Sequence, residues 1–288
     1  MKAPALKKSP TAATVQTKTA TATATASPQA NIQSVSFGSV GHQKRGHRVL
    51  IYGTGGIGKT TLACTAPSDV VYIDGEESLE ILKDQFEAQG IKSPLTIPSI
   101  TGFKTLRFAL ASQGWNSVRT ICLEAGILEK WATAYTIENV TGKGGQKMRN
   151  IEEYGYGAGF RHVYDAFLLL LNDFDRHARA GRNVILIAHE CVKKVPNPSG
   201  NDWIRYEPRL QDSDKASIRM AVKEWSDHTL FYSYDVTTKE DDERKAIGRG
   251  SRAIYTSELP HFMAKSRTTS ETIFVESPNS DVWSKIIK

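Results

Sequence analysis

The sequence predicts an α/β fold, with a mostly parallel central sheet flanked by helices and a β-rich C-terminal part. The first reason is a glycine-rich loop that joins an apolar run, residues 49–52, to a segment suited to a helix, residues 60–64. The second is a set of short apolar runs, typical of strands buried in a parallel sheet, at 69–74, 119–124 and 182–189. The third is the end of the chain, where apolar and polar residues alternate as in half-buried strands, at 229–234, 252–256 and 272–275.

Between these runs, apolar residues recur at helical spacing. The predicted helices span residues 78–88, 101–112, 160–180 and 215–225. A highly charged run, residues 239–245, joins the first two C-terminal strands and is predicted to be a solvated hairpin tip.

The charge of the chain is unevenly distributed. Its 288 residues are 40% hydrophobic and 24% charged, as in a globular protein with one main domain, and they carry a net charge of +6. Residues 1–48 contain seven lysines and arginines and no acid, and removing these seven leaves 30 basic against 31 acidic residues. A nucleic-acid site must therefore be argued from local loops rather than from the overall charge.

The N-terminal segment, residues 1–45, is a low-complexity stretch of threonine and alanine with few large apolar groups. Such a composition cannot offset the entropy of ordering, so we predict a disordered basic tail before one folded domain over 46–288. We interpret the tail as a solubilising leader, with loose lysine contacts to phosphates as the alternative. The acid-free start also resembles a transit peptide, but no arginine precedes Arg45.

Cysteine usage and hydropathy bear on the compartment. Cys64, Cys122 and Cys191 are far apart, which suits a reducing compartment and argues against a zinc site. No apolar run approaches the roughly 20 residues that span a bilayer, and the start contains no signal-peptide core. We expect a cytoplasmic protein without a membrane partner.

The glycine-rich loop fits the phosphate-binding pattern G-x-x-x-x-G-K-[ST], with Gly53, Gly58, Lys59 and Thr60 at its fixed positions. Glycines let backbone N–H groups surround phosphate oxygens closely. Lys59 would reach the β- and γ-phosphates, and the Thr60 hydroxyl would hold Mg²⁺, so we predict that the chain binds ATP with Mg²⁺. The predicted nucleotide-binding residues are Gly53, Thr54, Gly55, Gly56, Ile57, Gly58, Lys59, Thr60 and Thr61.

Polar residues follow the other predicted strands at their carboxyl ends, where open α/β sheets bind ligands. Asp74 and Glu76 follow one strand, and Glu124 ends the next. Glu124 stands where P-loop ATPases have a second Mg²⁺-organising acid, usually Asp, and the alternative is a charge at the start of a helix. His189 ends a further predicted strand. We interpret it as a sensor of the γ-phosphate, and the alternative is a structural role at the end of the strand.

Two basic stretches are candidates for contact with single-stranded DNA. Residues 140–159 are rich in glycine and contain tyrosines that would stack on bases, and residues 190–216 form a second loop broken by prolines. A solvated loop is the alternative for the first stretch. The DNA-binding candidates are Lys143, Lys147, Arg149, Lys193, Lys194 and Arg205.

The order of these elements resembles the RecA/RadA recombinase ATPase core over about residues 46–275, and most nearly the phage RecA-like ATPases of single-strand annealing and recombination. The resemblance implies that Glu76 positions the attacking water and that Asp74 supports its loop. It implies that Glu124 takes the metal-side aspartate position and His189 that of a strand-end glutamine switch. The two basic stretches fall where that family has its DNA-binding loops.

Near the C-terminus, Lys265 and Arg267 resemble the element that reaches ATP across a subunit interface in this family, a finger acting in trans. The resemblance thus implies a ring or filament of identical subunits. We therefore predict a Mg²⁺-dependent ATPase, with Glu76, Lys59 and His189 as catalytic residues.

The predicted role is in DNA recombination, repair or replication, with single-stranded DNA as partner and a single-strand-binding protein as a further one. If a phage encodes the chain, its place is the cytoplasm of the bacterial host. The alternatives are an ATPase that loads or remodels a protein partner, a P-loop small-molecule kinase, and a nucleotide-binding module without turnover.

Overall fold

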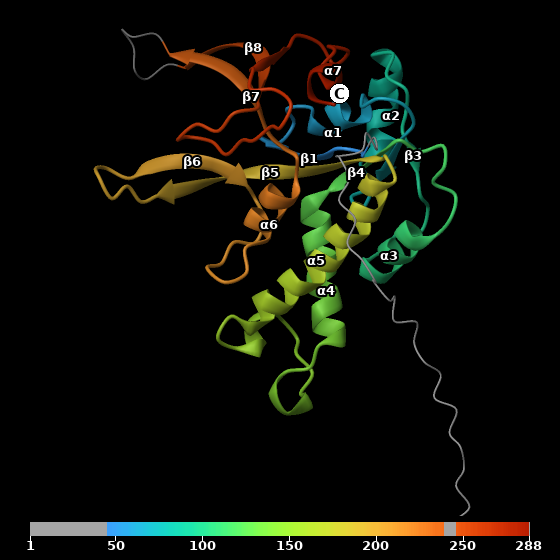
Figure 1. Cartoon of the computed structure of the whole chain (residues 1–288), viewed down its shortest axis with the longest axis vertical. Helices are drawn as coiled ribbons and strands as arrows, with labels where there is room; N and C mark the ends of the chain where they lie inside the picture. Colours follow the sequence, from blue (N-terminus) through green and yellow to red (C-terminus); the bar gives the residue numbers. More distant parts are fainter. Residues whose placement is uncertain (1–44, 239–245, 288) are drawn as a thin grey trace, which may run out of the picture. The chain divides into compact units, whose positions relative to one another are not determined.

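The computed structural model describes residues 45–238 and 246–287, whose strands form one sheet (Figure 1). The sheet order is β3-β2-β4-β5-β1-β7-β8-β9, and β6 pairs with β5 outside this path. Neighbouring strands from β3 to β7 are parallel, and β8 and β9 continue antiparallel. The strands are β1 Arg48–Gly53, β2 Val70–Ile73, β3 Leu95–Thr96, β4 Thr120–Glu124, β5 Asn183–Val195, β6 Trp203–Pro208, β7 His228–Thr238, β8 Ala246–Tyr255 and β9 Ile273–Val275.

Helices cover both faces of this sheet (Figure 1). They are α1 Lys59–Cys64, α2 Leu79–Ala88, α3 Phe103–Ala111, α4 Ala125–Asn139, α5 Ala158–Arg179, α6 Ile218–Trp225 and α7 Trp283–Ile286, with short 3-10 turns at Lys143–Gly145 and Glu152–Tyr154. The predicted fold class is confirmed as an α/β fold with a mostly parallel central sheet, flanking helices and a β-rich C-terminal part.

The central strand β1 shows why its sequence is continuously apolar. Val49 and Ile51 pack into a core with α1, α2 and α7, whereas Leu50 and Tyr52 pack into a core with α3, α4, α5 and α6. Successive strand residues point to opposite faces, and both faces are covered, so all four side chains are fully buried. Burial on both sides fixes β1, and with it the loop that leaves its carboxyl end.

The segment after His189 differs from the prediction. Residues 190–216 were expected to be a loop, but β5 continues to Val195 and pairs with β6 as an antiparallel ribbon. The two strands form cross-strand pairs, among them Val192 opposite Tyr206 and Lys194 opposite Ile204. Such pairs stabilise a ribbon that is not buried on both faces. Pro196, Pro198 and Gly200 lie in the turn that joins the strands, and Pro208 is the last residue of β6. We call β5 from Glu190 onward, together with β6, the ribbon.

The described residues, 45–238 and 246–287, belong to one compact unit. The predicted tail, residues 1–45, lies outside the described residues except for Arg45, and so does the predicted hairpin tip at 239–245. The division into a tail and one ATPase domain over 46–288 stays a prediction. Within the part of the chain that the structure describes, no helix has both the length and the apolar character needed to cross a membrane.

Candidate active site

The phosphate loop, residues 53–61, depends on glycine at three positions. Gly56 and Gly58 have φ angles of 77° and 99°, a left-handed region that suits glycine and strains most other residues. At Gly53 the reason is close approach, because a Cβ there would stand 2.0 Å from the carbonyl oxygen of Tyr232 on the neighbouring strand β7. The loop can therefore keep its backbone N–H groups free of side-chain cover.

Lys59 lies under this loop, with only 6% of its surface exposed. Its Nζ donates to the carbonyl oxygens of Gly53 and Thr54, at 3.0 and 2.7 Å. Burial lowers the pKa of Lys59, and the negative charges of Glu124 and Glu190 act in the opposite direction. The ammonium group thus lies within electrostatic reach of the acids at the carboxyl ends of β4 and β5.

The turn after β2 presents Glu76 to solvent and holds it in place from both sides. The carboxylate of Asp74 accepts the backbone N–H groups of Ser78 and the next residue, at 3.1 and 2.8 Å, and so satisfies the start of α2. A Cβ on Gly75 would stand 2.6 Å from Cγ2 of Ile127 in α4. Asp74 therefore supports the turn, as the resemblance implies, and close packing on α4 fixes the position from which Glu76 projects.

A cavity of about 390 Å³ brings together the three predicted residues Glu76, Glu124 and His189. Glu76 comes from the turn after β2 and Glu124 from the carboxyl end of β4. His189 is the last residue of β5 that pairs with β1, in register with Gly53, the first residue of the phosphate loop. The rest of the lining is Gly126, Glu129, Lys130, Arg209, Leu210 and Gln211. The predicted catalytic groups therefore meet next to the loop.

Glu124 is the residue before α4, but its side chain makes no capping hydrogen bond to that helix. As a helix-start charge it would act through the helix dipole alone. Burial, with a further contribution from the negative charge of Glu76, raises the pKa of Glu124 to about 7, against the effect of Lys59. A carboxyl group in this setting takes up a proton readily unless a cation neutralises it.

His189 is partly buried at the same cavity. Burial lowers its pKa, and the positive charges of Lys59 and Arg209 lower it further. The imidazole is consequently neutral near pH 7, able to donate one hydrogen bond and accept another. Across the cavity, Lys130 lies 3.9 Å from a carboxylate oxygen of Glu76.

The residues present fit a magnesium ion. Within 45–238 and 246–287, no three His, Cys, Asp or Glu side chains are grouped so that they could hold a metal by themselves. Mg²⁺ in phosphate sites uses one or two protein ligands and takes the others from phosphate and water. Thr60 is the second residue of α1, beside the loop, and a divalent cation would stabilise the ionised form of Glu124, which its surroundings disfavour.

Sequence reasoning missed Glu190, which follows His189 on β5. Burial raises the pKa of its carboxyl group, and the nearby Lys59 and Thr54 act in the opposite direction. An acid directly after a candidate sensor at a strand end was a signal that could have identified it.

Two arginines at the site come from distant segments and were not predicted. Arg209 lines the cavity just after β6. Arg252, on β8, donates from Nη1 to the carbonyl oxygen of Ile57 in the phosphate loop, at 3.2 Å. No local pattern marks either residue, since only the sheet order brings them to the loop.

The predicted trans-finger residues lie towards the amino ends of β1 and β7, away from the phosphate loop at the carboxyl end of β1. Lys265 pairs with Thr229, which is level with Leu50 of β1, and its Nζ donates to the carbonyl oxygen of Lys223 near the end of α6, at 2.6 Å. Arg267 is 63% exposed and lies 3.4 Å from Asp227, just before β7. Neither side chain meets the phosphate loop of its own chain.

The first predicted DNA loop connects α4 to α5. Lys143, Lys147 and Arg149 are exposed, and the ion pairs of the described residues include none of the three. Tyr156 is fully exposed, whereas the Tyr154 hydroxyl donates to backbone carbonyls of α4 and its end. Figure 1 shows this segment at the ends of α4 and α5 farthest from α1, and the 15 residues of α4 span about 22 Å.

The second set of DNA candidates lies on the ribbon and is paired with acids. Lys193 lies 3.6 Å from Asp212, and Lys194 lies 2.9 Å from Asp202. Arg205 is paired with Glu258 and Glu207, and only 15% of its side chain is exposed. The ribbon therefore offers fewer free positive charges than its sequence suggests.

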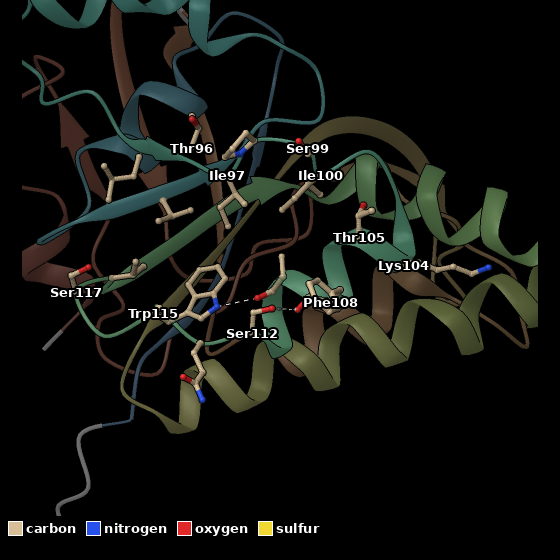
Figure 2. A pocket seen from close by; sticks show the side chains of 17 residues that line it. Thr96, Ile97, Ser99, Ile100, Lys104, Thr105, Phe108, Ser112, Trp115 and Ser117 are labelled. Atoms are coloured by element: carbon tan, nitrogen blue, oxygen red, sulfur yellow. Dashed lines mark hydrogen bonds between the residues drawn. The ribbon is translucent and has the colours of Figure 1, made fainter.

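A larger cavity, of about 890 Å³, lies at the sheet edge between β3 and α3 (Figure 2). Ile97, Ile100 and Phe108 contribute apolar side chains, and the indole N–H of Trp115 donates to the carbonyl oxygen of Ala109 at 3.1 Å. This cavity contains none of the predicted site residues. Glu76, Glu124 and His189 instead line the smaller, charged cavity.

Comparison with known proteins identifies a family and a structural likeness. A family model described as AAA domain matches residues 45–268. Among solved structures, the chain is similar to the flagellar accessory protein FlaH from Methanocaldococcus jannaschii, at 11% identity and a TM-score of 0.40, over 80% of this chain and 85% of that one. No curated protein matches the sequence. With the family model covering most of the chain, the protein belongs to the AAA domain family of P-loop ATPases.

Proposed function

We propose that the protein hydrolyses ATP with Mg²⁺ and couples this reaction to single-stranded DNA in recombination, repair or replication, as an assembly of identical subunits. The observation that supports hydrolysis most strongly is the meeting of Glu76, Glu124 and His189 at one cavity beside the phosphate loop.

The loop N–H groups and Lys59 would bind the β- and γ-phosphates, and Thr60 with Glu124 would hold Mg²⁺. A bound Mg²⁺ supplies charge neutralisation to the phosphates. The carboxylate of Glu76 is held on the tight turn after β2 and would orient the attacking water and accept its proton. The neutral imidazole of His189, adjacent to the loop, would donate a hydrogen bond to the γ-phosphate and report its presence along β5.

Assembly is supported by the separation of the finger residues from the phosphate loop of their own chain. Lys265 and Arg267 lie near the amino ends of β1 and β7, whereas the loop follows the carboxyl end of β1. They could supply charge to an ATP only if it were held by a neighbouring subunit. Hydrolysis would then depend on assembly.

DNA binding is supported by Lys143, Lys147 and Arg149, which are exposed together on a glycine-rich segment beside the exposed ring of Tyr156. Positive side chains suit phosphates and an exposed tyrosine suits base stacking. Lys193, Lys194 and Arg205 would contribute only if their acid partners were displaced.

The experiment that tests this proposal is ATP hydrolysis measured without DNA, with single-stranded DNA and with duplex DNA. The triple variant K143Q/K147Q/R149Q is compared with K83Q/K92Q/K285Q, which removes the same charge from exposed lysines on α2, after α2 and on α7. We expect single-stranded DNA to stimulate the wild type and the control, and the test variant to lose about two units of salt slope in DNA binding. If single-stranded DNA neither changes the rate nor binds more tightly with ATP, the proposal is wrong.

A specific observation favours a second candidate, an ATPase that acts on a protein partner. The outer face of the ribbon exposes Val192 and Ile204, at 57% and 62%, beside Tyr206. An apolar stripe of this kind suits a protein surface such as that of a single-strand-binding protein. In that case V192S/I204S would abolish partner-stimulated hydrolysis and leave DNA binding intact.

A further inference from the structure

Arg209 stands at the base of the ribbon, beside His189. Its backbone N–H donates to the carbonyl oxygen of His189 at 2.8 Å. This bond closes the ribbon where it meets the cavity, next to the pair formed by Glu190 and Pro208. The strand that carries His189 and the segment that carries Arg209 are therefore tied together.

The backbone on both sides of Arg209 is clamped by a second arginine. Arg219, of which only 3% is exposed, donates to the carbonyl oxygens of Pro208 and Leu210, at 2.8 and 3.3 Å. It also pairs with Glu207 and Asp212, at 2.6 and 2.8 Å. Arg209 thus projects from a rigid support, although its own side chain is exposed.

The guanidinium group of Arg209 is available, unlike those of its neighbours. It lines the cavity with Glu76, Glu124 and His189, and it is near enough to Lys59 to help lower the pKa of that lysine. Arg205 and Arg219 are each paired with two acids, but none of the ion pairs found in 45–238 and 246–287 includes Arg209. An unpaired cation at this cavity, on a rigid backbone and within electrostatic reach of the phosphate-loop lysine, is suited to a developing negative charge.

We propose that Arg209 is a catalytic residue that contacts the γ-phosphoryl group of ATP bound to its own chain and neutralises the charge that develops during its transfer to water. This inference rests on the proposed ATP hydrolysis. Because Arg209 and His189 share the base of the ribbon, a ligand that moves the ribbon would move both groups relative to the γ-phosphate. Binding of a ligand to the ribbon would thus change the positions of Arg209 and His189 at the active site.

The test compares R209Q and R209K with R179Q, which removes an exposed arginine near the end of α5. Three readouts are taken: binding of ADP, binding of a non-hydrolysable ATP analogue that retains a γ-phosphate, and kcat for ATP. For R209Q we expect ADP affinity within about threefold of wild type, a loss of about tenfold in the preference for the analogue over ADP, and a fall in kcat of about 10²- to 10³-fold. R209K should recover part of the binding preference, and R179Q should match the wild type.

If R209Q keeps both the analogue preference and kcat, the inference is wrong. If the wild type binds the analogue but does not hydrolyse ATP, the proposed function fails, and the binding preference still decides whether Arg209 contacts the γ-phosphate. Subunit mixing decides whether Arg209 acts on ATP bound to its own chain or to a neighbouring chain. In a mixture of R209Q and K59A, the K59A subunits could supply Arg209 only to the ATP of a neighbour, so the mixture should remain inactive. Recovery of activity in that mixture would overturn the assignment to the same chain.

Discussion

Glu76 and Glu124 face one cavity, and the negative charge of Glu76 adds to burial in raising the pKa of Glu124 to about 7. Two carboxylates in a partly buried space repel each other, and either a proton or a cation relieves the repulsion. The same pair that would hold a metal and orient water therefore makes the stability of the protein depend on pH.

Replacing Glu124 with Gln should raise stability at pH 8 in buffer without nucleotide or Mg²⁺. The pKa of Glu124 is about 7 in the folded protein and 4.5 ordinarily, so the folded state binds the proton more tightly. Ionisation of Glu124 therefore lowers the free energy of unfolding by its full amount above pH 7, and this loss disappears as the pH falls towards 4.5. Thermal unfolding from pH 5 to 8 should show a gain of at most about 3 kcal/mol at the upper end and little at the lower. E138Q, an exposed change on the same helix, is the control, and an equal gain at both pH values would contradict the explanation.

Replacing Glu76 with Gln should abolish hydrolysis and preserve binding. Gln keeps the size of the side chain but cannot accept a proton from water, so kcat should fall by about 10²- to 10⁴-fold. The affinity for ATP should change by less than about threefold. E77Q, on the adjacent exposed residue, should hydrolyse ATP normally. Rapid hydrolysis by E76Q would exclude Glu76 as the base.

Gly75 should not tolerate alanine. A Cβ there would stand 2.6 Å from Ile127 and 3.0 Å from Trp131, whereas one on Gly126 would meet nothing within 4 Å. G75A should lose about 1–3 kcal/mol of stability through overpacking, and its hydrolysis should fall because Glu76 moves with the turn. G126A, within α4, should gain up to about 1 kcal/mol from helix propensity. Equal melting temperatures for the two variants would show that the turn adapts.

His228 should make the protein sensitive to mild acid. It is fully buried, with its ring nitrogens 2.9 Å from His47 and 2.9 Å from Ser266. Burial, with the neighbouring His47, lowers its pKa to about 4 from 6.5. The stability that comes from keeping it neutral is complete above pH 6.5 and is lost as the pH falls from 6.5 to 4.

Unfolding of H228Q should therefore vary less over that range than unfolding of the wild type or of H261Q, whose histidine is exposed. The ion-paired Asp227 titrates separately, because its pKa is lowered to about 2 from 3.8, so its contribution is lost only at stronger acid. A wild-type stability that stays constant from pH 6.5 to 4 would contradict the prediction.

Much of the fold followed from local patterns. The apolar runs ending in Asp74, Glu124 and His189 became the parallel strands β2, β4 and β5, because residues buried on both faces must be continuously apolar. The main departure was the ribbon, where prolines and charges concealed strands that pair outside the sheet. Periodicity detects burial, and the ribbon is largely exposed.

The sequence by itself determined the phosphate loop and the acids at the strand ends, since both depend on residue types at fixed short spacing. Only the tertiary structure brought Arg209 to the cavity and Glu190 within electrostatic reach of Lys59, and only it placed Lys265 and Arg267 near the amino ends of β1 and β7. The physical reason is that these contacts join segments far apart in the chain, and their meeting depends on strand order and helix packing. Local spacing carries no information about either.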